Sequence, residues 1–238
     1  MELLSKEHWV KQSVFLKDFL RGLSLRDSSQ ELVGLKSSDR FYSKYRSTLH
    51  AQFILMLYTT LESVVIQSVQ DVFDVIKDQR ICFERLNKEI QKIYIKIKCP
   101  IDDNKSREEV FLSILGMLKK EKIVDVQCQK PFKRGNPFKR GSLHVKHIND
   151  HILEKIGINR FVFEIYHKNL RCNIVEKISE ISETCNKLAH GAESFQEYGS
   201  RLGIQDLRQY FCALCYYMHA YLRCIAKYIQ QKGYLKNE

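Results

Sequence analysis

The sequence contains few residues that interrupt helices. Only 3 of its 238 residues are proline and 10 are glycine. Small β-sandwiches and barrels need many turns, and turns depend on these two residues, so this composition disfavours both architectures. Hydrophobic residues make up 44% of the chain, enough for a substantial core. We therefore predict an all-α fold.

Long apolar runs are also absent. No stretch approaches the run of about 18 apolar residues that a membrane-spanning helix needs. The N-terminal region is unlike a secretory signal because charged residues recur through it, at Lys6, Glu7, Lys11, Lys17 and Asp18. We expect a cytoplasmic protein with no membrane partner.

The eight cysteines show no metal-binding or disulfide pattern. Cys212 and Cys215 form a C-x-x-C pair inside a helical pattern, without a second pair or a suitably spaced histidine. We expect reduced thiols on a helix face. His144, His147 and His151 recur at helical spacing, but neighbouring lysines disfavour a cation. No metal or other cofactor is predicted.

Acidic residues are scarce relative to basic ones. The chain has 39 Lys and Arg against 28 Asp and Glu, a formal net charge of +11. Such an excess attracts RNA, DNA or anionic lipid, and charge alone does not choose among them.

Apolar residues spaced by three and four predict a series of helices. A Ser106-x-x-Glu109 capping box precedes one of them. The second would be about 55 Å long, a length at which a helix can kink or break. We expect a single domain over residues 1–238, with an insertion over 99–165. The predicted helices cover residues 3–23, 39–76, 86–97, 110–117, 145–156, 166–190 and 206–228.

One segment of the insertion contains basic residues but no acidic ones. Residues 126–149 contain no acidic residue, and Pro-Phe-Lys-Arg-Gly occurs twice, at 131–135 and 137–141. Paired Pro and Gly predict an exposed loop over 129–147. This loop is either a solvated surface or a contact for RNA, with phenylalanines for base stacking. Its candidate phosphate contacts are Lys130, Lys133, Arg134, Lys139, Arg140 and Lys146.

The segment Cys185-Asn186-Lys187-Leu188-Ala189-His190-Gly191 follows a predicted helix. It resembles the Arg-Asn-x-x-Ala-His-Gly signature of the HEPN superfamily. Further segments are similar to the bacterial and cyanobacterial MAE-type HEPN branch, so that the resemblance extends from about residue 40 onward. These segments are 55–63, 141–143, 156–158, 194–199 and 232–235.

The resemblance implies a bundle of four to five core helices, with an inserted basic loop and short helices. It also implies a metal-independent endoribonuclease acting on tRNA or mRNA, serving as a toxin or in anti-phage defence. Family members are often homodimers in which two motifs face each other across a positive cleft, so we expect a homodimer. A cognate antitoxin is a further expected partner.

The resemblance also assigns roles to residues. His190 would be the catalytic acid or base, since an imidazole gains and loses a proton near neutral pH. Asn186 would orient His190 or the phosphate, and Lys187 would contact RNA. Glu62 is either a solvated charge or the buried polar residue that this family places near the motif.

Cys185 departs from the family pattern, because it occupies the position of the signature arginine. A neutral thiol cannot stabilise the charge that builds on phosphoryl oxygens during cleavage. Three interpretations stay open. The protein binds RNA without cutting it, a neighbour such as Lys187 or Arg171 substitutes, or the sequence carries an inactivating change. The alternative to a nuclease is a non-catalytic module that binds RNA or protein.

Overall fold

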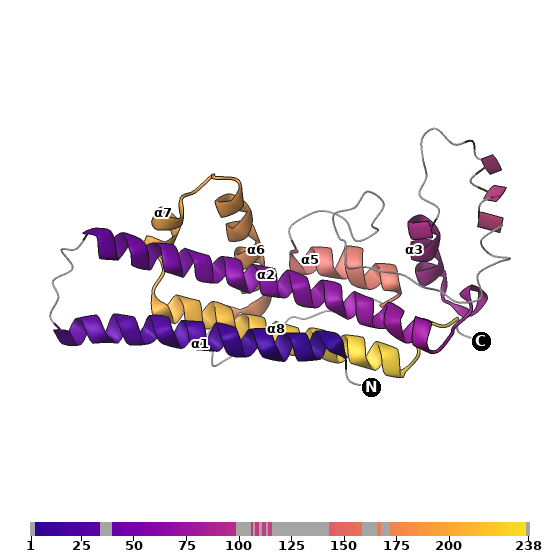
Figure 1. Cartoon of the computed structure of the whole chain (residues 1–238), viewed down its shortest axis with the longest axis horizontal. Coiled ribbons are helices and arrows are strands. Elements are labelled where there is room, and N and C mark those ends of the chain that lie inside the picture. Colours follow the sequence, from indigo (N-terminus) through magenta and orange to yellow (C-terminus); the bar gives the residue numbers. More distant parts are fainter. Residues whose placement is uncertain are drawn as a thin grey trace.

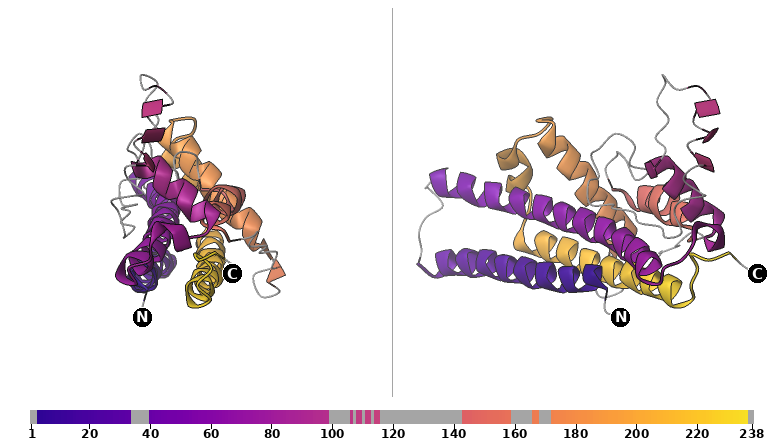
Figure 2. Two further views of the ribbon diagram at one scale, coloured as in Figure 1. Left: turned by 90° about the vertical axis from the view of Figure 1, so that its right-hand side faces the viewer. Right: turned by 45° about the vertical axis from the view of Figure 1, so that its right-hand side comes forward.

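Long helices running side by side dominate the structure, a computed structural model (Figure 1). It describes residues 3–33, 40–98, several between 106 and 115, 143–158, 166–167 and 172–236. Helices α1 and α2 form an antiparallel pair, and α8 packs against both of them. The two further views show α6 crossing above α2 and α8, with α7 lying on α2 (Figure 2). The bounds of these five helices are α1 Leu4–Val33, α2 Arg40–Asp78, α6 Ile174–Ala189, α7 Phe195–Ser200 and α8 Ile204–Gln230.

Shorter elements complete the described chain. A single antiparallel ladder pairs Tyr166 with Asn173 and His167 with Cys172. Helical residues otherwise dominate, so the predicted all-α fold is confirmed. The shorter elements are η1 Phe83–Arg85, α3 Lys88–Lys98, α5 Val145–His147, η2 Ile148–Leu153, η3 Glu154–Ile156, β1 Tyr166–His167 and β2 Cys172–Asn173.

Helix α2 is one continuous helix of 39 residues. It contains neither proline nor glycine, the residues that most often kink or end a helix. Its inward stripe includes Phe53, Leu57, Leu61 and Val65, all completely buried. Because α1, α6, α7 and α8 all pack on this helix, α2 is the central support of the bundle.

Residues 143–158 pack into the main core. Ile148, Leu153 and Ile156 are fully buried in the same cluster as the α2 stripe. This part of the predicted insertion therefore belongs to the core. Val145–His147 is helical, as the apolar spacing over 145–156 predicts, so the predicted loop over 129–147 overlaps this helix at its end. Residues 116–142, which hold the other five cations of that loop, lie outside the described residues.

Two helix boundaries differ from the sequence prediction. Helix α1 continues to Val33 instead of stopping near Leu23. Gly22 did not end it, since a single glycine only weakens a helix. Tyr166, predicted to be helical, lies in β1, and α6 begins after Asn173. The predicted capping box is confirmed, because the Glu109 N–H donates to Ser106 Oγ at 3.2 Å.

Residues Ser43–Asp78 of α2 are long and apolar enough to cross a membrane, but half of their most apolar window is buried inside the protein. The core helix of a soluble protein has the same properties. Among Cys82, Cys185, Cys212, Cys215 and Cys224 no disulfide forms. Burial raises the pKa of Cys215 to about 12, so this thiol is neutral at physiological pH.

Candidate active site at the end of α6

Helix α6 carries the motif and is fixed to the core along one face. Its N-terminus is capped by the Asn173 side chain, which accepts the Val175 N–H at 3.0 Å. Ile174, Ile178 and Ile181 are fully buried, one helical turn apart. The opposite face, which includes Asn186 and Lys187, is exposed to solvent.

The His190-Gly191 dipeptide of the motif ends this helix. Gly191 has φ +69°, the left-handed conformation that glycine adopts without strain. The Gly191 N–H donates to Leu188 O at 3.3 Å, and the Ala192 N–H donates to Lys187 O at 2.9 Å. These two bonds form a Schellman motif. As a result His190 is the C-cap of the helix, directly after its last residue Ala189, and its side chain is exposed.

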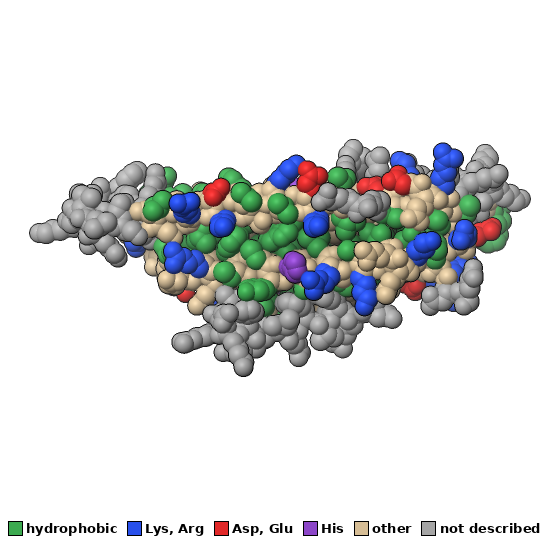
Figure 3. Space-filling model, turned by 90° about the horizontal axis from the view of Figure 1, so that it is seen from below, with side chains coloured by type: hydrophobic (Ala, Val, Ile, Leu, Met, Phe, Trp, Pro, Cys, Tyr) green, Lys and Arg blue, Asp and Glu red, His purple; other side chains and the backbone are tan. Residues whose placement is uncertain are grey.

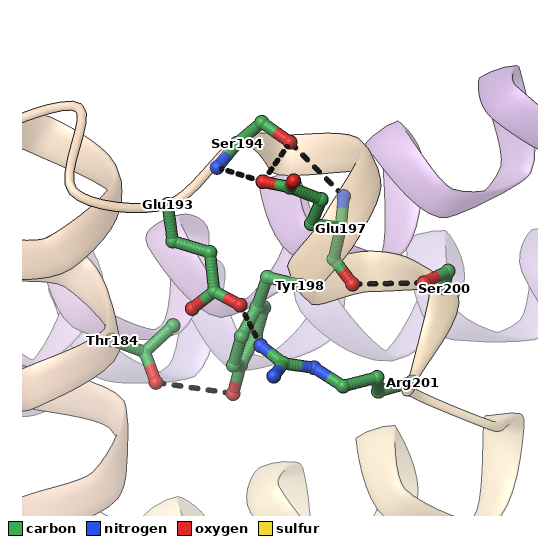
Figure 4. Close-up of polar contacts among 7 residues, drawn as sticks. All are labelled: Thr184, Glu193, Ser194, Glu197, Tyr198, Ser200 and Arg201. Carbon is green, nitrogen blue, oxygen red and sulfur yellow. Dashed lines mark hydrogen bonds and ion pairs between the residues drawn. The ribbon is translucent and has the colours of Figure 1, made fainter.

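A second cap follows immediately. Ser194 Oγ accepts the Glu197 N–H at 3.2 Å, and the Ser194 N–H donates to Glu197 Oε2 at 3.1 Å (Figure 4). This capping box starts α7. The end of α7 is fixed to α2, because the imidazole of His50 donates to Leu202 O at 2.8 Å. Hydrogen bonds therefore fix the chain both before α7, at Ser194, and after it, at Leu202.

An open hollow of about 660 Å³ lies between the end of α6 and α7. Its walls are lined by two cations, Lys187 and Arg201, and two carboxylates, Glu193 and Glu197, together with Ala192 and Ser200. Ala192 is two residues after His190, so the hollow begins close to the motif histidine in the chain, although His190 is not among the residues that line it. In a groove of mixed charge the cations attract a phosphate and the carboxylates repel it.

Arg201 is a site residue that the sequence did not reveal. It forms an ion pair with Glu193, and its guanidinium lies 5.5 Å from the centre of the Tyr198 ring (Figure 4). The Tyr198 hydroxyl accepts a hydrogen bond of 3.1 Å from Thr184 Oγ1 on α6. Arg201 thus interacts with Glu193 of the turn before α7 and with Tyr198 of α7, whose hydroxyl is bonded to α6. In the sequence, nothing except its position shortly after the motif could have indicated that Arg201 belongs to the site.

The other half of the motif faces inward. Cys185 is half-buried and packs against the core, where it interacts electrostatically with Glu62 and Tyr58 of α2. Burial raises the pKa of the Glu62 carboxyl. Burial, followed by the negative charge of Glu62, raises the pKa of the Cys185 thiol. The structure therefore places Glu62 beside the position that holds arginine in the signature.

The end of the basic segment is anchored in the same place. The Leu143 N–H donates to the Tyr58 hydroxyl at 3.3 Å, and Ser182 Oγ of α6 donates to Leu143 O at 2.8 Å. Lys146 follows on α5 and is exposed. Lys130, Lys133, Arg134, Lys139, Arg140 and Arg171 lie outside the described residues.

Groups of three or more metal-ligating side chains in suitable geometry do not occur in the part of the chain that the structure describes. The His147 and His151 rings lie 4.7 Å apart. Burial, and then the charges of His151 and Lys155, lower the pKa of His147. This imidazole is expected to be neutral at physiological pH.

Comparison with known proteins identifies the family but no individual relative. No curated protein and no solved structure matches the chain. The profile of the MAE_28990-like HEPN family matches residues 2–234, nearly the whole sequence. The chain therefore belongs to the MAE_28990-like HEPN family.

Proposed function

We propose that this protein binds RNA in the hollow beside His190 and cleaves it without a metal ion. The supporting observation is the exposed His190, held at the end of α6 by the Schellman motif, two residues before Ala192, which lines the hollow together with Lys187 and Arg201. The net charge of +11 supports a polyanionic partner. The anchored Leu143 adds to this, because the basic segment rejoins the core beside α6.

The reaction moves one proton from the 2′-oxygen to the 5′-oxygen and replaces one phosphorus–oxygen bond with another. His190 accepts the proton of a 2′-hydroxyl, whose oxygen attacks the adjacent phosphorus. The bond from phosphorus to the 5′-oxygen breaks, and the imidazolium returns the proton to that oxygen. The products are a 2′,3′-cyclic phosphate and a 5′-hydroxyl. Lys187 and Arg201 supply the positive charge near the phosphate.

Cys185 is expected to make this reaction slow. It supplies no charge, and its half-buried position faces Glu62 instead of the hollow. Removing one positioned electrostatic contact from an active site commonly reduces the rate by about 10²–10³. Cys185→Arg would place a cation against Glu62, lower the pKa of that carboxyl and raise the cleavage rate.

The test combines cleavage and binding on the same variants. Labelled tRNA and an mRNA fragment are incubated with EDTA and the wild type, Cys185→Arg or Cys185→Arg with His190→Ala. We expect Cys185→Arg to cleave the RNA faster than the wild type does and to leave cyclic-phosphate ends. Cleavage should be lost when His190→Ala is added to Cys185→Arg. Lys187→Ala and Arg201→Ala should weaken RNA binding, whereas Lys92→Ala on α3 should not. The proposal fails if Cys185→Arg neither cuts nor binds RNA.

The second candidate function is a non-catalytic module that binds RNA or protein. The placement of Cys185 favours it, since a neutral, half-buried thiol next to Glu62 leaves the signature cation absent. RNA binding without cleavage, even after arginine is restored, would support this function over the first.

The wider role is proposed from the family. A toxin or anti-phage defence effector with this activity would arrest growth when expressed alone, and a cognate antitoxin would prevent the arrest. Induced expression of Cys185→Arg in a bacterial host, beside its His190→Ala derivative, tests this role. Equal growth of the two strains would contradict it.

A further inference from the structure

Two carboxylates lie in the hollow that the proposed function assigns to an RNA phosphate. The chain as a whole is basic, and on the face of the molecule seen from below Lys and Arg side chains outnumber Asp and Glu (Figure 3). In the hollow the two cations are matched by two carboxylates, Glu193 and Glu197. The hollow is therefore formally neutral in a chain of net charge +11. An anion that enters must compete with these carboxylates for the cations.

The two carboxylates have different partners (Figure 4). Glu197 Oε2 accepts hydrogen bonds from the N–H and the Oγ of Ser194, at 3.1 and 2.7 Å, and so belongs to the cap of α7. Glu193 instead forms the ion pair with Arg201. Among the residues that the structure describes, Glu193 is thus the carboxylate that occupies a cation of the hollow.

The fold holds Glu193 against this cation. Directly before it, the Ala192 N–H donates to the last turn of α6 at 2.9 Å, and directly after it, the Ser194 N–H donates to the cap of α7 at 3.1 Å. The backbone of Glu193 is therefore fixed from both sides, and only 19% of its side-chain surface is exposed. Its carboxylate can leave Arg201 by rotation of the side chain alone.

Arg201 has support that does not depend on the carboxylate. Its guanidinium lies 5.5 Å from the centre of the Tyr198 ring, a distance at which a cation is attracted to the ring face. The ring itself is fixed, because its hydroxyl accepts a hydrogen bond of 3.1 Å from Thr184. With 63% of its side-chain surface exposed, Arg201 is also open to solvent. The guanidinium can therefore exchange one anionic partner for another and stay in place.

A carboxylate and a phosphate bind a guanidinium in the same way, each through two oxygens that accept from the planar fork of N–H donors. We infer that Glu193 is an internal competitor of the ligand: its carboxylate occupies Arg201 in the free protein, and an anion binds there only by displacing it. Because Glu193 is tethered next to Arg201, it competes at an effective concentration on the order of millimolar or higher. The inference rests on the proposed function for the identity of the anion, a phosphate of RNA.

This competition favours a polyanion over a single phosphate. A free phosphate only exchanges one partner of Arg201 for another and gains little. A strand can displace Glu193 with one phosphate and place a neighbouring phosphate near Lys187, which also lines the hollow. The ligand that fits is therefore a strand with consecutive phosphodiesters, and Glu193 keeps free phosphate from occupying the site.

A purely structural ion pair predicts the opposite effect of substitution. If Glu193 served only to fix Arg201 after α7, its removal would loosen the guanidinium and weaken anion binding. If Glu193 competes with the ligand, its removal strengthens anion binding. Exposed ion pairs contribute weakly, the equivalent of about 1.4–5-fold in a binding constant. We therefore expect Glu193→Gln, which keeps the shape of the side chain, to tighten anion binding about two- to fivefold.

The experiment measures the binding of two ligands to the full chain. Inorganic pyrophosphate is titrated by calorimetry, and labelled tRNA in EDTA is titrated by fluorescence anisotropy. Glu197→Gln is the matched control, because it removes the same charge from the same hollow while glutamine still completes a capping box. We expect Glu193→Gln to bind both ligands more tightly and Glu197→Gln to bind them nearly as the wild type does. Adding Arg201→Ala to Glu193→Gln should abolish the gain.

A measurement without ligand checks the ion pair itself. Phenylglyoxal modifies guanidinium groups, and mass spectrometry of peptides gives the rate at Arg201 relative to Arg80, an exposed residue just beyond the end of α2. Without its carboxylate partner Arg201 should react faster, so the relative rate should rise in Glu193→Gln and not in Glu197→Gln. Circular dichroism checks that each variant is as helical as the wild type.

Three results would overturn the inference: unchanged or weaker pyrophosphate binding by Glu193→Gln, an equal gain in Glu197→Gln, and no binding of pyrophosphate by any variant. The inference and the proposed function fail separately. Tighter pyrophosphate binding without any RNA binding supports internal competition and contradicts an RNA ligand. RNA binding with both affinities unchanged in Glu193→Gln contradicts internal competition and leaves the proposed function standing.

Discussion

Substitution of Gly199 by alanine should loosen α7 from α2. Gly199 is buried where the two backbones meet, and a Cβ atom there would lie 1.7 Å from Ser47 O. That distance is roughly 2 Å less than a favourable contact of about 3.5 Å. Neither backbone can rotate away as a flexible side chain would. The whole of α7 must therefore move outward.

We expect Gly199→Ala to lower the free energy of unfolding by about 2–4 kcal/mol, at the upper end of overpacking effects. For a chain of this size such a loss corresponds to a Tm lower by about 5–15 °C. Because α7 carries Tyr198 and is followed by Arg201, RNA binding should weaken as well.

The measurement is urea denaturation of Gly199→Ala beside Gly22→Ala. A Cβ atom at Gly22 meets nothing within 4 Å, so alanine there should stabilise α1 by about 0.5–1 kcal/mol. The same chemical change thus has opposite expected signs at the two sites. A free energy of unfolding for Gly199→Ala within 0.5 kcal/mol of the wild-type value would refute the close approach of α7.

Three further predictions concern one motif residue, Gly191, and two residues near the motif, Glu62 and Ser194. Burial raises the pKa of Glu62, so its ionisation costs stability as the pH rises through that pKa. Glu62→Gln should thus raise the Tm at pH 7–8 and leave it unchanged at acidic pH, which thermal denaturation across pH checks. Gly191→Ala forces a side chain into the left-handed conformation and should cost about 1 kcal/mol in denaturant titrations, with a smaller loss for Gly191→Asn. Ser194→Ala removes the α7 cap and should also lower the free energy of unfolding by about 1 kcal/mol. Ser194→Asp keeps a capping oxygen, so an unchanged free energy of unfolding in that variant would show that the cap carries the effect.

The helices with regular apolar spacing were predictable from the sequence. The starts of α2 and α8 lie within a few residues of their predicted positions, because apolar periodicity is a local signal. The end of α1 was missed, since the polar residues after Leu25 give no periodic signal and no proline stops the helix there. The two-residue strand at Tyr166 depends on its partner at Asn173, which a local pattern does not specify.

The site was predictable only where the motif itself carried it. His190 and Gly191 were identified from the residues, and their geometry follows from the need to end a helix. The electrostatic interaction of Glu62 with Cys185 depends on how α2 and α6 pack, and Arg201 reaches the hollow from the chain that directly follows α7. Such contacts join residues more than a hundred positions apart or across a helix end, where spacing in the sequence carries no information.

The unbroken length of α2 has a mechanical consequence. Three other segments are hydrogen-bonded to this one helix. The Ser5 N–H in the first turn of α1 donates to Asp71. The Leu143 N–H at the end of the basic segment donates to Tyr58, and His50 donates to Leu202 O after α7. A rod without a hinge transmits displacement between its attachments instead of absorbing it. Occupation of the hollow should therefore slow amide hydrogen exchange at the far end of α2, near Asp71, tens of ångströms from the bound molecule.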